Sequence, residues 1–276
     1  MSFPTWRLIP PIAANGRLQM AVDSWLLQEH RAGRQPPSLR FYTWTPVAIS
    51  LGYHQRRWPR RWQELTWQGE PIALIRRPTG GRAVLHQGDL TYAVVTSEGC
   101  GNLTAATRGD RRATYEAISQ FLVEGWTRLG VPLNYGQERS PDRSTPNCFD
   151  TATVADLVRP DGVKAIGSAQ LRQRHSILQH GSIPIDPCPQ LCERIFGSSG
   201  RGSGMRRYLE AIAPDSAALD PRQPWLERAI AVLVEAAEQC FRVRLVPEPL
   251  TEEEWEQISR LASPPLNPEK PALRPS

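Results

Sequence analysis

A cysteine and a lysine close together in this chain have side chains that could perform nucleophilic catalysis. Cys148 lies between a polar loop and a run with strand character, and Lys164 follows sixteen residues later, after a turn at residues 160–162. Only two of the 33 basic residues are lysines, and the second, Lys270, lies in a proline-rich tail. A nearby cation lowers the pKa of a thiol and makes it a strong nucleophile. A hairpin between the two residues would bring the ammonium group toward the thiol.

Both residues also have an ordinary interpretation. Most cysteines are small, inert hydrophobic residues, and we read the other four, Cys100, Cys188, Cys192 and Cys240, as structural. Lys164 could be one surface strand residue among many, but a lysine is a compact donor that a planar guanidinium does not replace. Its place in an otherwise apolar strand favours a specific role.

A glycine-rich turn joins two runs with strand character between residues 76 and 86. Consecutive glycines let the main chain approach a ligand closely and present N–H groups to a carbonyl or phosphate. A hairpin also needs glycine, and this turn lacks the Gly-Lys-Ser/Thr end of a phosphate-binding P-loop. The candidate binding residues of this segment are Arg77, Thr79, Gly80, Gly81, Arg82 and His86.

The strand that begins at Lys164 and the run after it supply a second set of candidates. Small residues at positions 167–169 leave space beside the lysine for a slender ligand, although they also suit tight sheet packing. His180, like His86, could carry a proton or serve as a hydrogen-bonded structural residue. The candidates here are Gly167, Ser168, Ala169, Gln170, His180 and Gly181.

These residues need a sheet to position them, and the pattern predicts one. Strand-like runs occupy about 39–44, 47–51, 72–77, 90–95, 152–158, 163–166, 177–185 and 241–246. Helical spacing follows Asn15, a candidate cap, as far as Leu27, and recurs over about 112–129, 225–239 and 251–261. Strands mixed with flanking helices predict an α+β fold with mixed, largely antiparallel sheets.

The length of 276 residues allows one large domain, or one domain with an appendage. We expect a catalytic domain over residues 1–200, a mainly helical part over 201–262 and a flexible proline-rich tail over 263–276. The helical part is either an appendage or a continuation of the first domain.

Composition narrows the classes of protein. No apolar run approaches the roughly 20 residues of a membrane helix, and the N-terminus lacks a secretory signal, so we expect a cytoplasmic protein. Five cysteines, an odd number, fit free thiols, and none has a partner at zinc-site spacing. The formal charge of +5 favours an acidic partner. Because the arginines are scattered and no nucleic-acid module is visible, that partner is expected to be a protein.

The motifs resemble the lipoate-protein ligase A and biotin ligase superfamily. The resemblance rests on the segments 76–86, 90–92, 164–170 and 178–183, and it covers the chain from about residue 6 to residue 185. Thr-Gly-Gly-Arg at 79–82, in place of a triple-glycine turn, and Asn-Cys-Phe-Asp at 147–150 resemble the LipM-type octanoyltransferases. The implied fold is a biotin/lipoate ligase-like catalytic domain.

The resemblance also implies roles. Cys148 would be the acyl-accepting nucleophile, Lys164 would engage the acyl carbonyl, and residues 77–86 would wall the acyl pocket. The implied activity moves an octanoyl group from octanoyl-acyl carrier protein, through a Cys148 thioester, to a lysine of a lipoyl domain or of the glycine cleavage H protein. No ATP, other cofactor or metal is expected, because one thioester replaces another and the final amide forms downhill. The protein is expected to be a monomer that binds neither nucleic acid nor membranes.

Three alternatives remain open from the sequence. An amidotransferase with the same cysteine and lysine would move octanoyl between lipoyl domains. An ATP-dependent lipoate or octanoate ligase would form an acyl-adenylate and would not need Cys148. A non-catalytic scaffold would bind lipoyl domains or acyl carrier proteins without accepting an acyl group. Acyl chain length and the general base for the incoming lysine are also undetermined.

Overall fold

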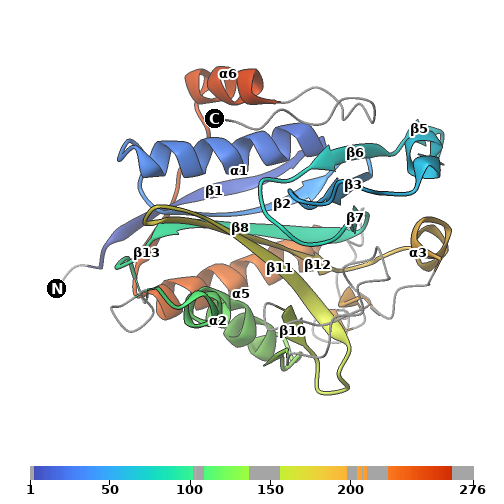
Figure 1. The fold of residues 1–276 in the computed structure, drawn as a ribbon. Coiled ribbons are helices and arrows are strands. Elements are labelled where there is room, and N and C mark those ends of the chain that lie inside the picture. Colours follow the sequence, from blue (N-terminus) through green and yellow to red (C-terminus); the bar gives the residue numbers. More distant parts are fainter. Residues whose placement is uncertain are drawn as a thin grey trace.

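An eight-stranded sheet runs through the centre of the molecule, with helices on both of its faces (Figure 1). The computed structural model describes residues 3–101, 103, 109–136, 156–197, 204–206, 208–209 and 223–262. In spatial order the strands are β13 (Arg244–Pro247), β1 (Thr5–Ala14), β2 (Ser38–Trp44), β8 (Asp89–Ser97), β12 (Ser176–Pro184), β11 (Lys164–Gln173), β10 (Asp156–Val158) and β9 (Asn134–Tyr135). Within this sheet, only the pairings of β1 with β13 and β2 are parallel. The predicted α+β fold with largely antiparallel pairing is confirmed.

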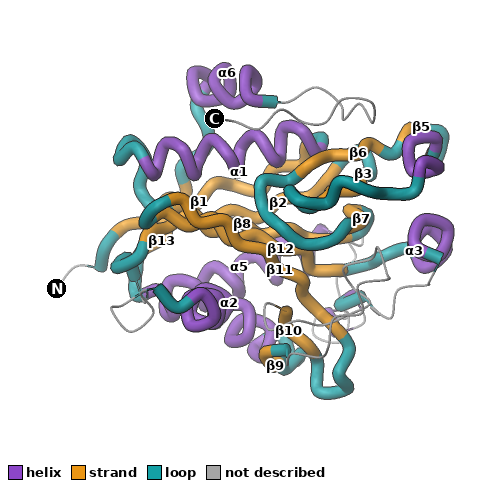
Figure 2. Tube along the Cα trace, viewed as in Figure 1, coloured by secondary structure: helices purple, strands orange, loops and turns teal. Residues whose placement is uncertain are grey.

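A smaller sheet packs beside one end of the large sheet (Figure 2). It contains β6 (Ala73–Arg76), β3 (Ala48–Leu51) and β7 (Val84–His86), in that order. A two-stranded ribbon of β4 (Thr66–Trp67) and β5 (Glu70–Pro71) follows a 3₁₀ turn, η1 (Arg60–Glu64). The predicted glycine turn therefore joins β6 to β7, and both strands pair with β3.

The helices divide between the two faces of the large sheet. Helices α1 (Gly16–Arg31) and α6 (Glu252–Leu261) pack together on one face, and α2 (Arg111–Arg128) packs with α5 (Gln223–Phe241) on the other (Figure 1). A shorter helix, α3 (Pro189–Phe196), lies beyond the end of β12. No helix in the described ranges combines the length and apolar composition that would let it cross a membrane.

Local signals explain where two of the helices begin. The side chain of Asn15 accepts hydrogen bonds from the backbone N–H groups of Arg17 and Leu18, each at 3.1 Å, and these bonds satisfy donors that lack partners within α1. Thr251 and Glu254 form a reciprocal capping box at the start of α6. The first helix was predicted from Asn15 as its cap, and the second was predicted over residues 251–261 from helical spacing.

Several strands depart from the sequence prediction: the short strands β4, β5 and β9 were not predicted, nor was β1, and β13 begins later than expected. Pro10 and Pro11 normally argue against a strand at β1. In the structure the pairing of β1 with β2 shifts register between Ile9 and Ile12, and this irregularity accommodates the two prolines. The strand predicted for 241–246 begins later, at Arg244, because α5 continues to Phe241.

The C-terminal segments contact the N-terminal half directly. β13 is hydrogen-bonded to β1, and the Arg7 guanidinium pairs with the Glu254 carboxylate at 2.8 Å. The boundary at residue 200 remains a prediction, and the tail from residue 263 lies outside the described residues.

Candidate active site

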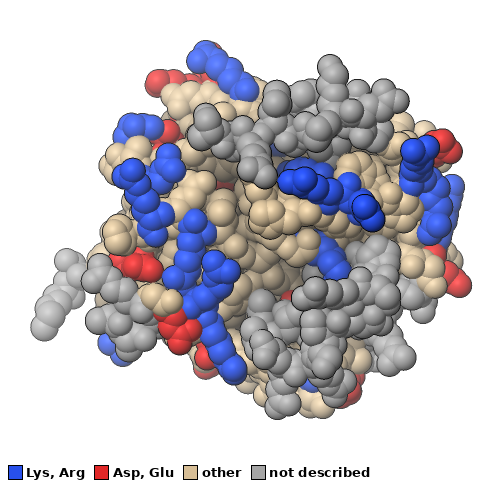
Figure 3. All heavy atoms as spheres, in the orientation of Figure 1, with Lys and Arg blue, Asp and Glu red and all other residues tan. Residues whose placement is uncertain are grey.

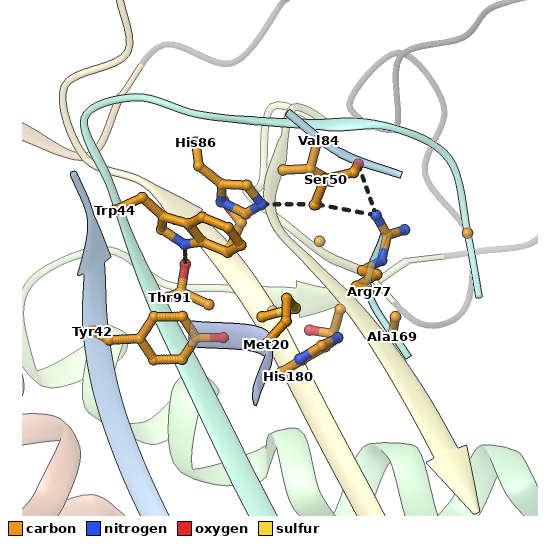
Figure 4. A pocket seen from close by; sticks show the side chains of 15 residues that line it. Met20, Tyr42, Trp44, Ser50, Arg77, Val84, His86, Thr91, Ala169 and His180 are labelled. Carbon is orange, nitrogen blue, oxygen red and sulfur yellow. Dashed lines mark hydrogen bonds between the residues drawn. The ribbon is translucent and has the colours of Figure 1, made fainter. Parts of the chain in front are cut away.

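A pocket opens between the α1 face of the large sheet and the smaller sheet (Figure 4). Its walls enclose about 430 Å³ of empty space, part of which opens to solvent. Large hydrophobic and aromatic side chains alternate with glycines and short polar residues around it. The lining residues are Met20, Tyr42, Trp44, Ser50, Arg77, Gly81, Val84, His86, Thr91, Gly167, Ser168, Ala169, His180, Gly181 and Ser182.

Strand register determines the floor of the pocket. Residues directly opposite each other on neighbouring strands present their side chains to the same face of a sheet. One row across the sheet runs Tyr42, Thr91, Ser182, Gly167, and the next runs Arg40, Ala93, His180, Ala169. The row beyond, which includes Leu171, Leu178 and Val95, packs into the apolar cluster beneath α1. The floor is thus two rows deep.

A buried chain of hydrogen bonds crosses one side of the pocket. The Nδ1 atom of His86 lies 2.8 Å from Asp89 Oδ2, and its Nε2 atom lies 2.8 Å from Ser50 Oγ. Asp89 also accepts hydrogen bonds from the hydroxyls of Ser182 and Thr91. Burial lowers the pKa of His86, and the attraction of Asp89 opposes this effect. The neutral ring therefore donates a hydrogen bond from Nδ1 to the Asp89 carboxylate and accepts a hydrogen bond from the Ser50 hydroxyl at Nε2.

A second buried chain of hydrogen bonds lies on the side of α1, and it also joins a carboxylate, a histidine and a hydroxyl group. The Nδ1 atom of His180 lies 2.7 Å from Asp23 Oδ2, and its Nε2 atom lies 2.6 Å from Thr79 Oγ1. Arg40 pairs with Asp23 at 3.1 Å, and the Tyr42 hydroxyl donates to the same carboxylate at 2.9 Å. Burial, and then the charge of Asp23, raise the pKa of Tyr42 well above its ordinary value, so the phenol remains a donor.

The glycine turn is held by an arginine rather than by strand pairing. The Arg77 guanidinium donates to the carbonyl oxygens of Ser50, Gly80 and Arg82, over distances of 2.7–3.2 Å. Gly81 takes a φ of 97°, where L side chains are strained, and its carbonyl would lie 1.9 Å from any Cβ added at Gly52. Two glycines are therefore required for this turn to close over the pocket.

An irregularity in strand pairing decides which way Lys164 points. Leu157 pairs with Ile166, but the next residue, Val158, pairs with Lys164, so that Ala165 is an extra residue in β11. Simple alternation would place Lys164 on the face of Ile166, toward α2 and α5. The bulge instead places it on the face of Gly167, which is the face that lines the pocket.

Lys164 forms a buried ion pair on that face. Its Nζ atom lies 2.9 Å from Asp156 Oδ1, and both side chains are only 3% exposed. An opposite charge at this distance favours the ammonium form of a lysine. The pair places a positive group on that face at the beginning of β11, although neither side chain is among those that line the pocket.

Eight of the predicted binding residues line the pocket, and four do not. The eight are Arg77, Gly81, His86, Gly167, Ser168, Ala169, His180 and Gly181. Thr79 contacts the site through His180, and the Arg82 carbonyl accepts from Arg77. Gly80 and Gln170 line an adjacent cavity, which α1 and the start of α2 also border. Cys148 lies outside the described residues, and its role and that of Lys164 remain predictions.

The sequence analysis missed the acidic residues of the site and one whole wall. The acids are Asp23, Asp89 and Asp156, all buried. The sequence contained a sign of these acids, because each lies in or beside a run of apolar residues. A charged residue in such a run is rarely buried unless it has a partner, so its position indicates one. The lining residues that were not predicted as site residues are Met20, Tyr42, Trp44, Ser50, Thr91 and Ser182, whereas Val84 lies within the segment 77–86 that was predicted to wall the acyl pocket. Among the described residues, no three His, Cys, Asp or Glu side chains are grouped as metal ligands.

Comparison with known proteins identifies the family. Residues 15–213 match the model of the lipoyl protein ligase A/B catalytic domain, and the chain belongs to this family. The octanoyltransferase LipM of Kyrpidia tusciae is 36% identical over 266 residues, covering 93% of this chain and 94% of the relative. The predicted resemblance to LipM-type octanoyltransferases, and with it the expectation of an acyltransferase, is confirmed.

Solved structures support the same fold. A crystal structure of lipoate-protein ligase A bound with ATP superposes with a TM-score of 0.68 at 18% identity, over 95% of this chain and 94% of that one. A bipartite lipoate protein ligase from Thermoplasma acidophilum, studied with its E2 lipoyl domain, gives a TM-score of 0.63 at 18% identity, over 95% and 92% of the two chains. At these identities the likeness establishes the fold alone.

Proposed function

We propose that this octanoyltransferase takes an octanoyl group from octanoyl-acyl carrier protein onto Cys148 and then passes it to a lysine of a lipoyl domain or of the glycine cleavage H protein. The observation that carries the proposal is the buried Lys164–Asp156 pair on the pocket face of β11. It places a positive charge on the strand face that borders a pocket whose exposed wall surface is mainly apolar.

The polar groups of the pocket suit an acyl chain because they are already engaged. Ser50, Thr91, Ser182 and both histidines bond to protein partners, so they present few unsatisfied donors or acceptors to the cavity. A buried polar group without a partner would favour a polar ligand. A saturated hydrocarbon chain forms no hydrogen bonds, and its transfer from water into the pocket is favourable in free energy.

Two half-reactions account for the transfer. The Cys148 thiolate attacks the donor thioester carbonyl, the bond to the carrier's sulfur breaks, and the carrier leaves as a thiolate that takes up a proton. The neutral amine of the acceptor lysine then attacks the enzyme thioester, its proton leaves to a base, and Cys148 is released as the amide forms. The covalent intermediate predicts ping-pong kinetics.

Lys164 would act in both half-reactions without changing its protonation state. Each step develops negative charge on the acyl oxygen, and a pre-positioned donor is worth ~3 kcal/mol in such a transition state. Asp156 holds the Nζ atom in place by an ion pair of 2.9 Å, which suits an electrostatic role better than that of a general base.

Surface charge fits acidic protein partners. Lys and Arg side chains predominate on the face shown in Figure 3, and the formal net charge is +5. Acyl carrier proteins and lipoyl domains are expected to be acidic, and complementary charge speeds encounter. We expect the rate at low donor concentration to fall as salt is added. A rate that does not change between low and high salt would contradict this part of the proposal.

The deciding experiment is an intact-mass measurement after mixing with octanoyl-acyl carrier protein in the absence of ATP. We expect one hydroxylamine-labile octanoyl adduct that is chased onto an apo lipoyl domain. The adduct should be lost in Cys148→Ala and kept in the matched control Cys188→Ala, which alters a free cysteine of α3's N-terminus.

Other outcomes would select the alternative functions. Octanoylation of the lipoyl domain that needs octanoate and ATP, and that survives Cys148→Ala without any enzyme adduct, would indicate a ligase. An adduct formed from an octanoylated H protein but not from the acyl carrier protein would indicate an amidotransferase. Binding of either carrier without any acyl transfer would indicate a scaffold.

A further inference from the structure

We infer that Met20, set against a rigid Trp44, closes the methyl end of the acyl pocket and determines the length of the acyl chain that this enzyme transfers. The inference rests on the proposed function, because it takes the pocket as the acyl site and Lys164 as the group at the carbonyl. It concerns residues at the opposite side of the pocket from the reacting atoms.

The sheet gives the pocket a direction. Trp44 follows Tyr42 by two residues on β2 and so faces the same side of the sheet, while Lys164 occupies the same face on β11. The strand order β2, β8, β12, β11 separates them by three interstrand spacings, ~14 Å in total. An extended octanoyl group spans roughly 9 Å, given C–C bonds of ~1.5 Å. A chain whose carbonyl meets Lys164 therefore points its methyl end toward β2.

Trp44 forms a fixed wall at that end. Its indole stacks on His86, with ring centroids 3.7 Å apart and an interplanar angle of 11°, and its Nε1 donates to Thr91 Oγ1 at 2.8 Å. Behind it, a Cβ added at Gly16 would lie 2.4 Å from the ring. Contacts on three sides leave the indole little freedom to move away from a longer chain.

Met20 forms the rest of the same wall, and its side chain is the more flexible of the two. It lies one turn after Gly16, which contacts Trp44, and three residues before Asp23, which binds His180 at 2.7 Å. Residues three or four apart share a helix face, so Met20 fills the gap between Trp44 and His180. Figure 4 shows it beside Tyr42 and His180, on the side of the pocket opposite Val84. An unbranched thioether side chain packs adaptably, and nothing else from α1 lines the described pocket.

Two substitutions should move the chain-length preference in opposite directions. Shortening the side chain in Met20→Ala frees space at the methyl end, and we expect the ratio of decanoyl to octanoyl transfer to rise about tenfold. Filling the space in Met20→Phe should instead raise the ratio of hexanoyl to octanoyl transfer by about the same factor. If Met20→Ala gives little soluble protein, Met20→Val makes the milder change in the same direction.

The experiment is a competition among hexanoyl, octanoyl, decanoyl and dodecanoyl acyl carrier proteins, read by intact mass of the acyl-enzyme and of the acylated lipoyl domain. The control is Leu26→Ala, which removes a comparable volume from the same helix and the same apolar cluster but does not line the pocket. It should lower stability and leave the chain-length profile unchanged.

The outcomes separate this inference from the function on which it rests. A native enzyme that accepts octanoyl, with Met20 variants that keep the native profile, would overturn the role of Met20 and leave the function intact. A profile that shifts equally in Leu26→Ala would overturn it too, because loosened packing would then explain the shift. A native enzyme that accepts no acyl chain would overturn the proposed function itself.

Discussion

The two faces of the large sheet differ in what they bury. The face toward α2 and α5 packs a large apolar cluster, and its main polar feature is a hydrogen-bonded group formed by Tyr92, Ser119, Ser168 and Gln179. The face toward α1 and the smaller sheet buries charges, including Asp23, Asp89 and the Lys164–Asp156 pair. Burying charge costs free energy even when it is paired. We conclude that the first face stabilises the fold and that the second is organised around the site.

Strand β11 contributes neighbouring side chains to both faces in an irregular order. Ile166 lies in the apolar cluster, whereas Lys164, only two residues earlier, lies on the charged face. In a regular strand these two side chains would point the same way. The extra residue at Ala165 separates them, so one residue of backbone irregularity divides a position in the apolar cluster from one in a buried ion pair.

The largest expected effect comes from Lys164→Arg. The variant keeps a positive charge for Asp156, but its bulkier, planar head no longer reaches the acyl oxygen in the same geometry. We expect the fold to persist, as judged by circular dichroism, and octanoyl transfer to fall by about 100-fold or more. Near-normal turnover would remove Lys164 from the reaction and make the charged face structural.

Asp156→Asn tests whether the ion pair positions that lysine. Leaving a buried ammonium without its carboxylate typically costs about 3–5 kcal/mol, so both the unfolding midpoint and the transfer rate should fall. The double variant Asp156→Asn/Lys164→Gln separates the two effects. We expect it to recover much of the stability, measured by urea unfolding, and to recover none of the transfer.

Leu122→Ala makes the opposite change, on the apolar face. Leu122 is fully buried in α2 within the cluster that α5 completes. Its truncation should lower the free energy of unfolding by about 2–5 kcal/mol. We expect kcat/KM per folded molecule and the chain-length profile to stay within about twofold of the native values. A selective loss of transfer in a still-folded variant would show that the two faces are coupled.

The smallest expected effect is a pH dependence from His86. Burial lowers its folded-state pKa below the ordinary 6.5, so below that pH the unfolded chain binds a proton that the native protein excludes. The stabilisation is complete above about 6.5 and is lost progressively as the pH falls from 6.5 toward the lowered value. Unfolding free energies measured between pH 7.5 and 5 should fall less steeply in His86→Asn. An unchanged slope would show that His86 is not the group responsible.

The sequence by itself determined the local elements and the motifs. Asn15 and the capping pair Thr251–Glu254 act within one turn of chain, and apolar spacing reports helix and strand faces directly, so these elements were predictable. The glycine turn, the strand after Lys164 and the run at 178–183 were recognisable as segments, and eight of the binding residues predicted in them line the pocket.

Only the tertiary structure decided how those segments meet. Asp23 and His180 are 157 residues apart, and their contact exists because α1 packs across β12. The side of the sheet that Lys164 faces depends on a one-residue bulge, and sequence alternation predicts the opposite side. Met20 looks like any apolar helix residue until packing places it against Trp44. Strand register and helix docking are set by long-range contacts, which no local pattern of residues encodes.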